Sequence, residues 1–195
     1  MIVEIMYELK RQEKDKYRRL PNVYWVTDLV RCPLKREFEI KYPDLTSSDL
    51  LNPVFILGML VHMGLEKILV DFRHAEVEVE KYKKVKIGEG QEVVISGRID
   101  ALIDKKIGVE IKTSRSDTGI PLEHHVLQCK IYNWLFDIDK TILVYVTPDR
   151  FTEYEVSGKL GDEDIVKLIT EATAPRYDWE CNYCTFRVIC PRKKK

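Results

Sequence analysis

Acidic and basic side chains alternate with apolar ones in two short segments in the middle of the chain. Asp100 follows the apolar Ile99, and ten residues later Glu110 and Lys112 lie between apolar neighbours. Because alternate side chains of a strand share one face, Glu110 and Lys112 are predicted to point the same way. Converging carboxylates repel each other unless a cation neutralises them, and Mg²⁺ or Mn²⁺ suits a site rich in oxygen ligands. Such an ion can polarise a phosphodiester and hold an attacking water, which Lys112 would orient or help to deprotonate.

Asp100 joins this face in only one kind of hairpin. If the connection between the two strands has an odd number of residues, Asp100 and Glu110 share a face, whereas a slip of one residue turns Asp100 away. We predict the odd connection Lys105 to Ile107, which pairs Asp100 with Lys112. The three charged residues also fit a cross-strand salt-bridge ladder, which surface hairpins often carry. The two strands alone leave both interpretations open.

Helix-spaced polar residues on either side of these strands can complete such a site. Gly58, His62 and Glu66 recur every four residues and therefore share one helix face. A neutral imidazole can join carboxylates around a metal ion, although a lone helical histidine is more often a satisfied core residue. Further along the chain, Gln128 and Tyr132 place an amide and a phenol on one helix face. This second pair is suited to gripping a substrate beside the metal.

Three cysteines near the C-terminus have the spacing of metal ligands. Two residues separate Cys181 from Cys184 and five separate Cys184 from Cys190, so the thiolates can reach one metal from a tight turn. Cys32, nearly the whole chain away, is the candidate for a fourth ligand and would staple the two ends of the chain together. Zinc and an iron–sulfur cluster both fit four cysteines, and spacing alone slightly favours zinc. Cys129 is expected to be a small buried side chain.

The composition describes a globular chain without net charge. Its 195 residues suffice for one main domain, with 45% apolar and 33% charged residues. Lys plus Arg equal Asp plus Glu at 32 each, so bulk charge gives no argument for nucleic acid and any DNA contact must come from local patches. The longest apolar run, residues 54–61, is too short to span a bilayer, and the sequence has no signal-peptide pattern. We therefore expect a cytoplasmic protein without a membrane partner, and a basic tail at residues 192–195 that is a solvated end.

Hydrophobic periodicity and turn residues predict the elements that position these side chains. Thr27 and Asp28 are predicted to cap a helix that carries Cys32 in its first turns. The other predicted helices cover residues 53–72, 122–136 and 162–172. The predicted strands cover residues 76–86, 92–104, 108–113, 141–147 and 151–156. This order indicates an α/β or α+β sheet covered by helices.

In their order along the chain, the candidate site residues described above resemble those of a known family. This family is the RecB-like nucleases of the PD-(D/E)XK superfamily that carry an iron–sulfur cluster. The matching residues are His62, Asp100, Glu110-Ile111-Lys112, Gln128, Tyr132, one upstream cysteine and three C-terminal ones. The size of the chain and its Cys32-Pro33 and Cys190-Pro191 pairs are most similar to the small CRISPR-associated RecB-like exonucleases. The resemblance spans about Val26 to Pro191. Ile99 stands where the superfamily name has proline, at a position that carries no metal ligand.

The resemblance implies a restriction-endonuclease-like mixed central sheet flanked by helices, with a C-terminal iron–sulfur cluster lobe. A single RecB-like nuclease domain would then cover residues 1–195. Within it, residues 23–50 would form an N-terminal helical segment that carries Cys32, residues 53–156 the nuclease core, and residues 175–195 the cysteine-rich cluster-binding segment.

The resemblance also implies a role for each site residue. A 4Fe-4S cluster would be bound by Cys32, Cys181, Cys184 and Cys190. The divalent metal, Mn²⁺ or Mg²⁺, would be bound by His62, Asp100, Glu110 and the carbonyl of Ile111. Lys112 would assist the nucleophile, with Glu110 and Asp100 as the other catalytic residues. The DNA-binding residues would be Gln128 and Tyr132 near the scissile phosphate, with Arg98 and Arg115 expected among the cations around the site.

The activity that the resemblance implies is metal-dependent hydrolysis of single-stranded DNA from an end. Its implied role is CRISPR adaptation, in which the enzyme would process spacer precursors with the CRISPR integrase complex as partner. The same chemistry would also serve DNA repair, or a virus or mobile element. An interpretation of another class is a non-catalytic DNA-binding assembly module with an idle metal site. The residues leave open whether the chain forms a homo-oligomer.

Overall fold

The computed structural model contains a mixed central sheet and describes residues 1–50, 52–88 and 90–194. Within these residues six strands form one sheet in the order β1-β3-β4-β5-β6, and β2 pairs with β3 outside this path. The strands are β1 (Val23–Trp25), β2 (Glu76–Lys86), β3 (Glu92–Ile103), β4 (Ile107–Thr113), β5 (Lys140–Val146) and β6 (Phe151–Ser157). β1 runs parallel to β3 and β5 parallel to β4, whereas the other neighbours are antiparallel.

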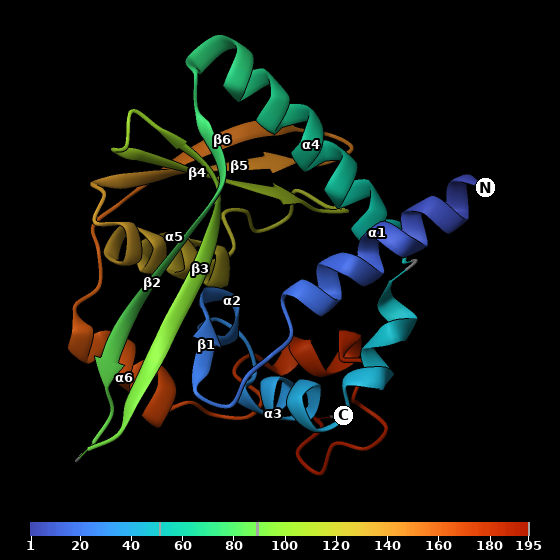
Figure 1. The fold of residues 1–195 in the computed structure, drawn as a ribbon, viewed down its shortest axis with the longest axis vertical. Helices are drawn as coiled ribbons and strands as arrows, with labels where there is room; N and C mark the ends of the chain where they lie inside the picture. The colour runs from blue at the N-terminus through green and yellow to red at the C-terminus, as the bar shows by residue number, and fades with distance from the viewer. Residues whose placement is uncertain (51, 89, 195) are drawn as a thin grey trace.

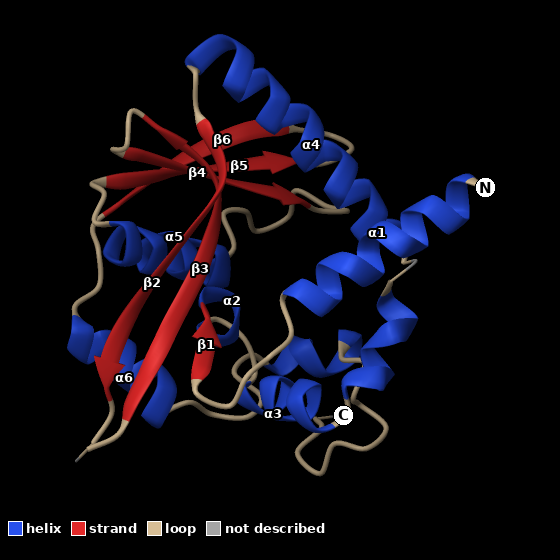
Figure 2. Ribbon diagram, in the orientation of Figure 1, coloured by secondary structure: helices blue, strands red, loops and turns tan. Residues whose placement is uncertain are grey.

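Two helices cover the opposite faces of the sheet (Figure 2). On one face, α4 (Pro53–Arg73) packs Val61 and Leu65 against the buried Ile111 of β4. On the other face, α5 (Glu123–Phe136) buries Ile131 in a core cluster that contains Ile99 of β3. Because successive residues of β4 face opposite ways, Glu110 and Lys112 lie on the α5 side of the sheet.

Segments from both ends of the chain lie side by side next to the sheet (Figure 1). Besides α4 and α5, the structure contains α1 (Ile2–Lys16), α2 (Val26–Leu29), α3 (Pro33–Lys41), α6 (Asp162–Thr170) and the 3-10 helices η1 (Pro43–Asp49) and η2 (Asp178–Tyr183). The backbone N–H of Cys32 donates to Oε1 of Glu180 at 2.8 Å, and the Thr185 hydroxyl donates to Oδ2 of Asp49 at 2.8 Å. These bonds join α3 and η1 to the C-terminal segment.

The expected fold class, a mixed sheet flanked by helices, is confirmed, but two local predictions are wrong. The connection between β3 and β4 is odd, as predicted, but it comprises Asp104–Lys106, since Ile103 pairs with Ile107. If this register is continued by one residue, Asp100 lies opposite Glu110 and not opposite Lys112. Asp104 and Lys105 take positive φ angles of 51° and 56°, which gives the tight reversal that starts the turn early.

The second error concerns the helix that was predicted to carry Cys32. α2 already ends at Leu29, and Cys32 is the N-cap of the following helix, whose first residue is Pro33. Asp28 does act near the helix start, because its carboxylate accepts a hydrogen bond from the N–H of Trp25 at 2.9 Å. Proline favours the first position of a helix, so a new helix begins directly after Cys32.

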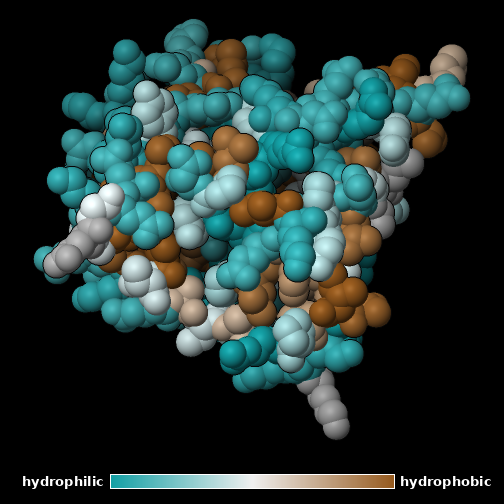
Figure 3. Space-filling model, turned by 60° about the horizontal axis from the view of Figure 1, so that its bottom comes forward, coloured by the Kyte–Doolittle hydropathy of each residue, from teal (hydrophilic) through white to brown (hydrophobic). Residues whose placement is uncertain are grey.

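The sequence prediction missed α1 and β1. No residue of α1 is buried, and β1 has only three residues. The end of α1 that projects from the molecule carries brown, apolar surface (Figure 3), formed by exposed side chains such as Ile2, Ile5 and Leu9. Ile2, Ile5, Met6 and Leu9 do have the spacing of one helix face, so the sequence contained a one-sided pattern that the prediction from periodicity overlooked.

α4 is longer and more apolar than the run of residues 54–61 suggested. By length and composition alone, Pro53–Arg73 could cross a membrane, and no part of the tested window is buried. One such helix is weak support for a membrane span, and α4 packs one face against the sheet through Val61 and Leu65. The same face carries His62 and Glu66 toward β3.

Candidate active site

One edge of β3 has no strand partner over residues 97–100 in the described part of the chain. On that edge β1 pairs with residues 94–96 and β4 with residues 101–103, while β2 runs along the opposite edge. Side chains bond the backbone in this gap. The Tyr132 hydroxyl donates to the carbonyl oxygen of Arg98 at 2.8 Å, and the N–H of Ile111 donates to Oδ2 of Asp100 at 2.6 Å. The gap lets side chains from both faces of the sheet approach Asp100.

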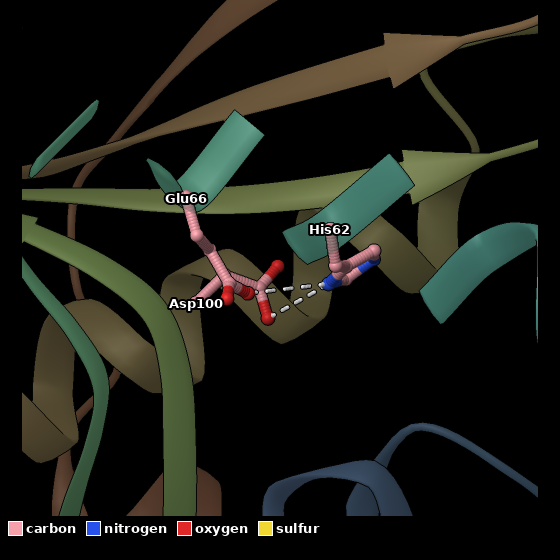
Figure 4. A group of neighbouring side chains, drawn as sticks. All are labelled: His62, Glu66 and Asp100. Atoms are coloured by element: carbon pink, nitrogen blue, oxygen red, sulfur yellow. Dashed lines mark ion pairs between the residues drawn. The ribbon is translucent and has the colours of Figure 1, made fainter. Parts of the chain in front are cut away.

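His62 and Glu66 reach Asp100 from α4 (Figure 4). Nδ1 of His62 lies 3.4 Å from Oδ1 of Asp100 and 3.9 Å from Oε1 of Glu66, and one ligand atom of each residue lies within 4.8 Å of the others. Gly58 lets α4 come this close, because a Cβ there would lie 3.1 Å from Oγ1 of Thr113. The four-residue spacing seen in the sequence therefore does bring His62 and Glu66 to one point on β3.

The acids around His62 disturb one another. Burial lowers the pKa of His62, but the hydrogen bond and charge of Asp100 outweigh it, so the pKa is raised above its ordinary value. Burial, followed by repulsion from Glu78 and Asp100, raises the pKa of Glu66 to about 7. These shifts show a site with more negative charge than its own cations neutralise.

Glu78 is a site residue that the sequence did not reveal. It lies on β2 between the paired Val77 and Val79, at the position opposite Asp100, where it takes a φ of 52°. This left-handed conformation costs a residue other than glycine on the order of 1–3 kcal/mol, and such strain is typical of functional sites. A glutamate in a run of alternating Glu and Val residues gave no indication of it.

Glu110 has one carboxylate oxygen in use and one without a partner. Its side chain is only 3% exposed, and Oε1 accepts from Nζ of Lys112 at 2.6 Å and from Nε2 of Gln128 at 2.7 Å. Within the described residues, Oε2 is buried with no hydrogen-bond partner. Burial, and then the charge of Asp100, raises the pKa of Glu110 to about 7. An unsatisfied buried acceptor costs about 1–3 kcal/mol, which a bound cation would offset.

The donor set fits a hard divalent cation. An imidazole nitrogen and carboxylate oxygens from three acids surround the gap, and Oε1 of Glu66 is buried without a hydrogen-bond partner, like Oε2 of Glu110, among the described residues. A salt-bridge ladder, the competing interpretation of the hairpin, would satisfy Oε1 of Glu110 through Lys112 and leave these two oxygens unsatisfied. The geometry therefore favours a metal site.

The four expected DNA-binding residues are not placed alike. Gln128 and Tyr132 line the cleft but are both buried and engaged, Gln128 with Glu110 and Tyr132 with the β3 backbone. Arg98 also lines the cleft, yet it pairs with Glu78 at 2.6 Å and with Glu13 of α1 at 3.2 Å. Arg115 is exposed on the loop after β4 and is absent from the lining of the described cleft. The structure thus brings three of the four together.

The cleft itself is a cavity of about 490 Å³ beside the gap in β3. The candidate residues that line it are His62, Arg98, Asp100, Glu110, Lys112, Gln128 and Tyr132. α1 contributes Lys10, Glu13 and Lys14, and Tyr17 follows directly, so the helix missed by sequence prediction forms one wall. The balanced net charge of the chain did not reveal the cations on this wall.

Four of the five cysteines line a second cavity of about 170 Å³, and they are Cys32, Cys181, Cys184 and Cys190. None of the five is in a disulfide. Burial raises the pKa of the Cys32 thiol. Cys129 is fully buried elsewhere, in a cluster with Leu143, as expected of a structural cysteine. Four free cysteines from both ends of the chain thus line one cavity.

The basic tail packs beside these cysteines. Lys193 lines the cysteine cavity, Nζ of Lys194 lies 2.7 Å from Oδ1 of Asp178, and the N–H of Lys194 lies 3.4 Å from Sγ of Cys181. Lys195 lies outside the described residues. The tail is therefore held against the protein in part, which differs from the expected free solvated end.

Comparison with known proteins gives relatives that match over the whole chain. No family model matches the chain. It is 45% identical to the CRISPR-associated exonuclease Cas4 of Saccharolobus solfataricus over 201 residues, which cover 99% of each protein. The crystal structure of SSO0001 superimposes with a TM-score of 0.95 at 45% identity, covering 100% of this chain and 98% of that one. An alkaline exonuclease from Laribacter hongkongensis shares the fold alone, with a TM-score of 0.52 at 12% identity over 82% of this chain and 88% of that one.

Proposed function

The chain belongs to the family of the CRISPR-associated exonuclease Cas4, and we propose that this DNA exonuclease acts mainly on single strands, from an end. The observation that carries the proposal is the meeting of His62, Asp100 and Glu110 at the gap in β3, beside Lys112. Side chains from one helix and two strands converge there, and their positions are fixed by regular elements, as a preorganised site requires.

We assign the divalent-metal site, for Mn²⁺ or Mg²⁺, to His62, Asp100, Glu110 and the carbonyl of Ile111. When bound, the ion would polarise the phosphodiester, hold the attacking water and stabilise the charge that develops at phosphorus. The unpartnered oxygen of Glu110 supports the assignment, and so does the hydrogen bond from Ile111 to Asp100. Glu66, next to His62, is a further acid within reach.

The chain's own residues prepare this site in distinct ways. Lys112 holds Oε1 of Glu110 and is placed to orient the attacking water. Burial lowers the pKa of Lys112, but the charges of Glu110 and Asp100 outweigh it and raise the pKa, so this side chain acts as a cation and a proton donor. Gln128 donates a hydrogen bond to the same oxygen of Glu110, so both donors contact Oε1. Oε2 of Glu110 has no hydrogen-bond partner among the described residues and can bind the ion. Tyr132 bonds the open edge of β3 at Arg98. Gln128 and Tyr132 line the cleft, so a phosphate bound there would lie beside them.

The wall formed by α1 supports a single-stranded substrate. Lys10 and Lys14 of α1 line the cleft opposite the sheet, with Arg19 and Arg98 nearby. A groove with cations on its wall can follow the backbone of one strand, and the unpaired strand needs no opening of a duplex. Arg115, exposed on the loop after β4, would contact the strand outside the cleft.

We further propose that Cys32, Cys181, Cys184 and Cys190 bind a 4Fe-4S cluster. All four line one cavity, and the family resemblance favours iron over the zinc that spacing alone allows. The cluster would fasten α3 to the C-terminal segment. A protein that is brown as purified and contains iron would support this assignment, whereas a colourless protein with one zinc ion would contradict it.

A cleavage assay tests the proposed activity. The cluster-bearing protein is incubated with linear and circular single-stranded DNA and with duplex DNA, each with Mn²⁺, Mg²⁺ or EDTA. We expect metal-dependent shortening of the linear single strand, resistance of the circle, and a loss of about 100-fold or more in Glu110→Ala. The exposed Glu153 of β6 provides the matched control, since Glu153→Gln should cleave normally. Equal cleavage of circle and linear strand would contradict an end-dependent enzyme.

We propose that the enzyme serves CRISPR adaptation, in which it processes spacer precursors in the cytoplasm with the CRISPR integrase complex; the CRISPR-associated relative supports this role. Co-purification with the integrase and trimming of overhangs on integrase-bound DNA would support this role. Activity on free ends without any effect on integrase substrates would instead favour the repair or mobile-element role.

A further inference from the structure

An aromatic surface lies one helical turn beyond the cleft. On α5, His124, Gln128 and Tyr132 recur every four residues and share one face. Gln128 and Tyr132 line the cleft, whereas His124 contacts Tyr177 and Trp179 from the C-terminal segment. The face of α5 that begins at the metal site therefore ends at rings supplied by the other end of the chain.

The rings of His124, Tyr177 and Trp179, here called the aromatic group, contact one another directly. The centroid of His124 lies 5.1 Å from that of Trp179 and 5.7 Å from that of Tyr177, and Tyr177 stacks on Trp179 at 5.9 Å with an interplanar angle of 15°. Trp179 nevertheless leaves 46% of its surface exposed. An indole that served only to pack this lobe would gain from being buried, so its exposure needs another explanation.

The aromatic group consists of uncharged rings, and cationic side chains line the cavity beside it. Burial, and then the charge of Lys112, lowers the pKa of His124 to about 4, so this ring is neutral at pH 7 and offers a flat face rather than a cation. The cysteine cavity that Trp179 lines is also lined by the cations Lys35, Arg187, Arg192 and Lys193. Neutral aromatic rings flanked by Lys and Arg form single-strand binding surfaces, in which bases stack and phosphates pair with the cations.

We propose that Trp179, supported by Tyr177 and His124, is a stacking site for a nucleobase of single-stranded DNA, and that the strand runs from the metal site along α5 to this lobe. The inference rests on the proposed DNA substrate and adds a base-contacting site outside the catalytic carboxylates. Stacking accepts any base, because every base has a π face. Trp179 precedes Cys181 by two residues, so the cysteine-lined centre would also position the ring.

A binding measurement with and without bases tests this site. Cluster-bearing protein is titrated, in EDTA to prevent cleavage, with a fluorescent single strand and with an abasic strand of the same length and charge. We expect Trp179→Ala to weaken binding of the base-bearing strand by about tenfold and to leave the abasic strand unaffected, while Trp179→Phe restores most of the affinity. Tyr82→Ala is the matched control, since Tyr82 of β2 is a 69% exposed aromatic away from the cysteine cavity, with no ring contact within the described residues.

Two results would overturn the proposal: equal affinity of the wild type for both strands, or a Trp179→Ala variant with unchanged discrimination between them. If Trp179→Ala loses its metal centre, photocrosslinking of wild-type protein to a 5-iodouracil strand replaces it. Crosslinks to the peptide with Tyr177 and Trp179 support the site, and crosslinks found only elsewhere refute it. A separate Mn²⁺ cleavage assay distinguishes the nuclease activity from the stacking site. Binding that depends on the bases, without any cleavage, would refute the nuclease activity alone. Cleavage by a Trp179→Ala variant that binds DNA like the wild type would refute the stacking site alone.

Discussion

The backbone N–H of Ile111 donates a hydrogen bond to Oδ2 of Asp100 at 2.6 Å, just beyond the last paired positions of β3 and β4. A buried amide at the end of a ladder needs a partner, and here a side chain supplies it. The other oxygen of the same carboxylate lies 3.4 Å from Nδ1 of His62. Asp100 therefore lies both at the end of the strand pairing and in the candidate metal site. Its charge and its hydrogen bond to Ile111 can be tested separately.

Substitutions at Asp100 should separate folding from activity. Asp100→Asn keeps an acceptor for the Ile111 amide, so we expect a free energy of unfolding no lower than that of the wild type and a loss of cleavage of about 100-fold or more. Asp100→Ala removes the acceptor as well and should lower the free energy of unfolding by about 1–3 kcal/mol relative to Asp100→Asn. Urea unfolding and end-labelled cleavage measure the two effects, and equal stability of both variants would show that the hydrogen bond contributes little.

The metal-free protein should lose stability as the pH rises above 6.5, the ordinary pKa of a histidine. The folded-state pKa of Glu110 is raised from 4.5 to about 7, so between these values the folded state binds more protons than the unfolded state. Glu110 alone therefore contributes stability that is fully present below pH 4.5 and is lost as the pH rises through 7, by about 3 kcal/mol. The raised pKa values of Glu66 and His62 act in the same direction. The lowered pKa values of His124 and His125 act in the opposite direction below pH 6.5, so the net decline is expected above that pH.

Thermal melts in EDTA from pH 6.5 to pH 8, where His124 and His125 are neutral in the folded state and largely neutral in the unfolded state, measure this decline. Glu110→Gln, which cannot ionise, should flatten the profile, and Mn²⁺ should raise Tm more at pH 8 than at pH 6.5, because the ion binds the ionised carboxylates. A metal-free profile that rises over this range would contradict the buried negative charge that the geometry indicates.

Lys112 should matter for turnover more than for metal binding. Lys112→Met keeps much of the side-chain volume but removes the ammonium group 2.6 Å from Oε1 of Glu110. We expect cleavage to fall by about 10²–10⁴-fold, the range for loss of a general acid or base. Mn²⁺ affinity, measured by calorimetry, should change far less. Loss of Mn²⁺ binding in this variant would mean that Lys112 mainly positions the ligands.

α1 should be held over the cleft by the ion pair between Glu13 and Arg98. The pair is part-exposed at 3.2 Å, and no residue of α1 is buried. The helix is also fastened by Lys14, which donates to the carbonyl oxygen of Pro43, and by Lys16, which pairs with Glu80, so loss of one pair should loosen it only in part. Glu13→Gln should speed amide hydrogen exchange in α1 by about two- to fivefold, as expected for a pair worth less than about 1 kcal/mol. Glu8→Gln, which breaks the Glu8–Arg11 pair within α1, is the control and should not release the helix from the sheet.

Removal of one cysteine should disconnect the two ends of the chain. Cys32→Ser should lose the brown colour and bound iron, and it should lower the free energy of unfolding by several kcal/mol, because metal binding contributes to folding. Cys129→Ala, a change to the cysteine outside the cavity, should keep the iron. Iron analysis and thermal melts provide the measurements, and a Cys32→Ser protein with full iron content would remove Cys32 from the proposed ligand set.

Local periodicity in the sequence determined which side chains share a face. Alternation along β4 put Glu110 with Lys112, and four-residue spacing put His62 with Glu66 and Gln128 with Tyr132. Helix and strand geometry repeats over a few residues, so these relationships do not depend on the rest of the chain. An odd hairpin connection was likewise predictable, because only that parity keeps Asp100 with the other acid.

Only the tertiary structure decided how these faces meet. The unpaired stretch of β3, the strained Glu78 beside it and the wall formed by α1 depend on register and packing between segments far apart in sequence. The same holds for Arg98, which the fold ties to Glu13, and for Arg115, which it leaves outside the cleft. Local residue preferences cannot specify such contacts, because each one forms only when the chain closes a long loop and the gain is shared among all the elements that pack there.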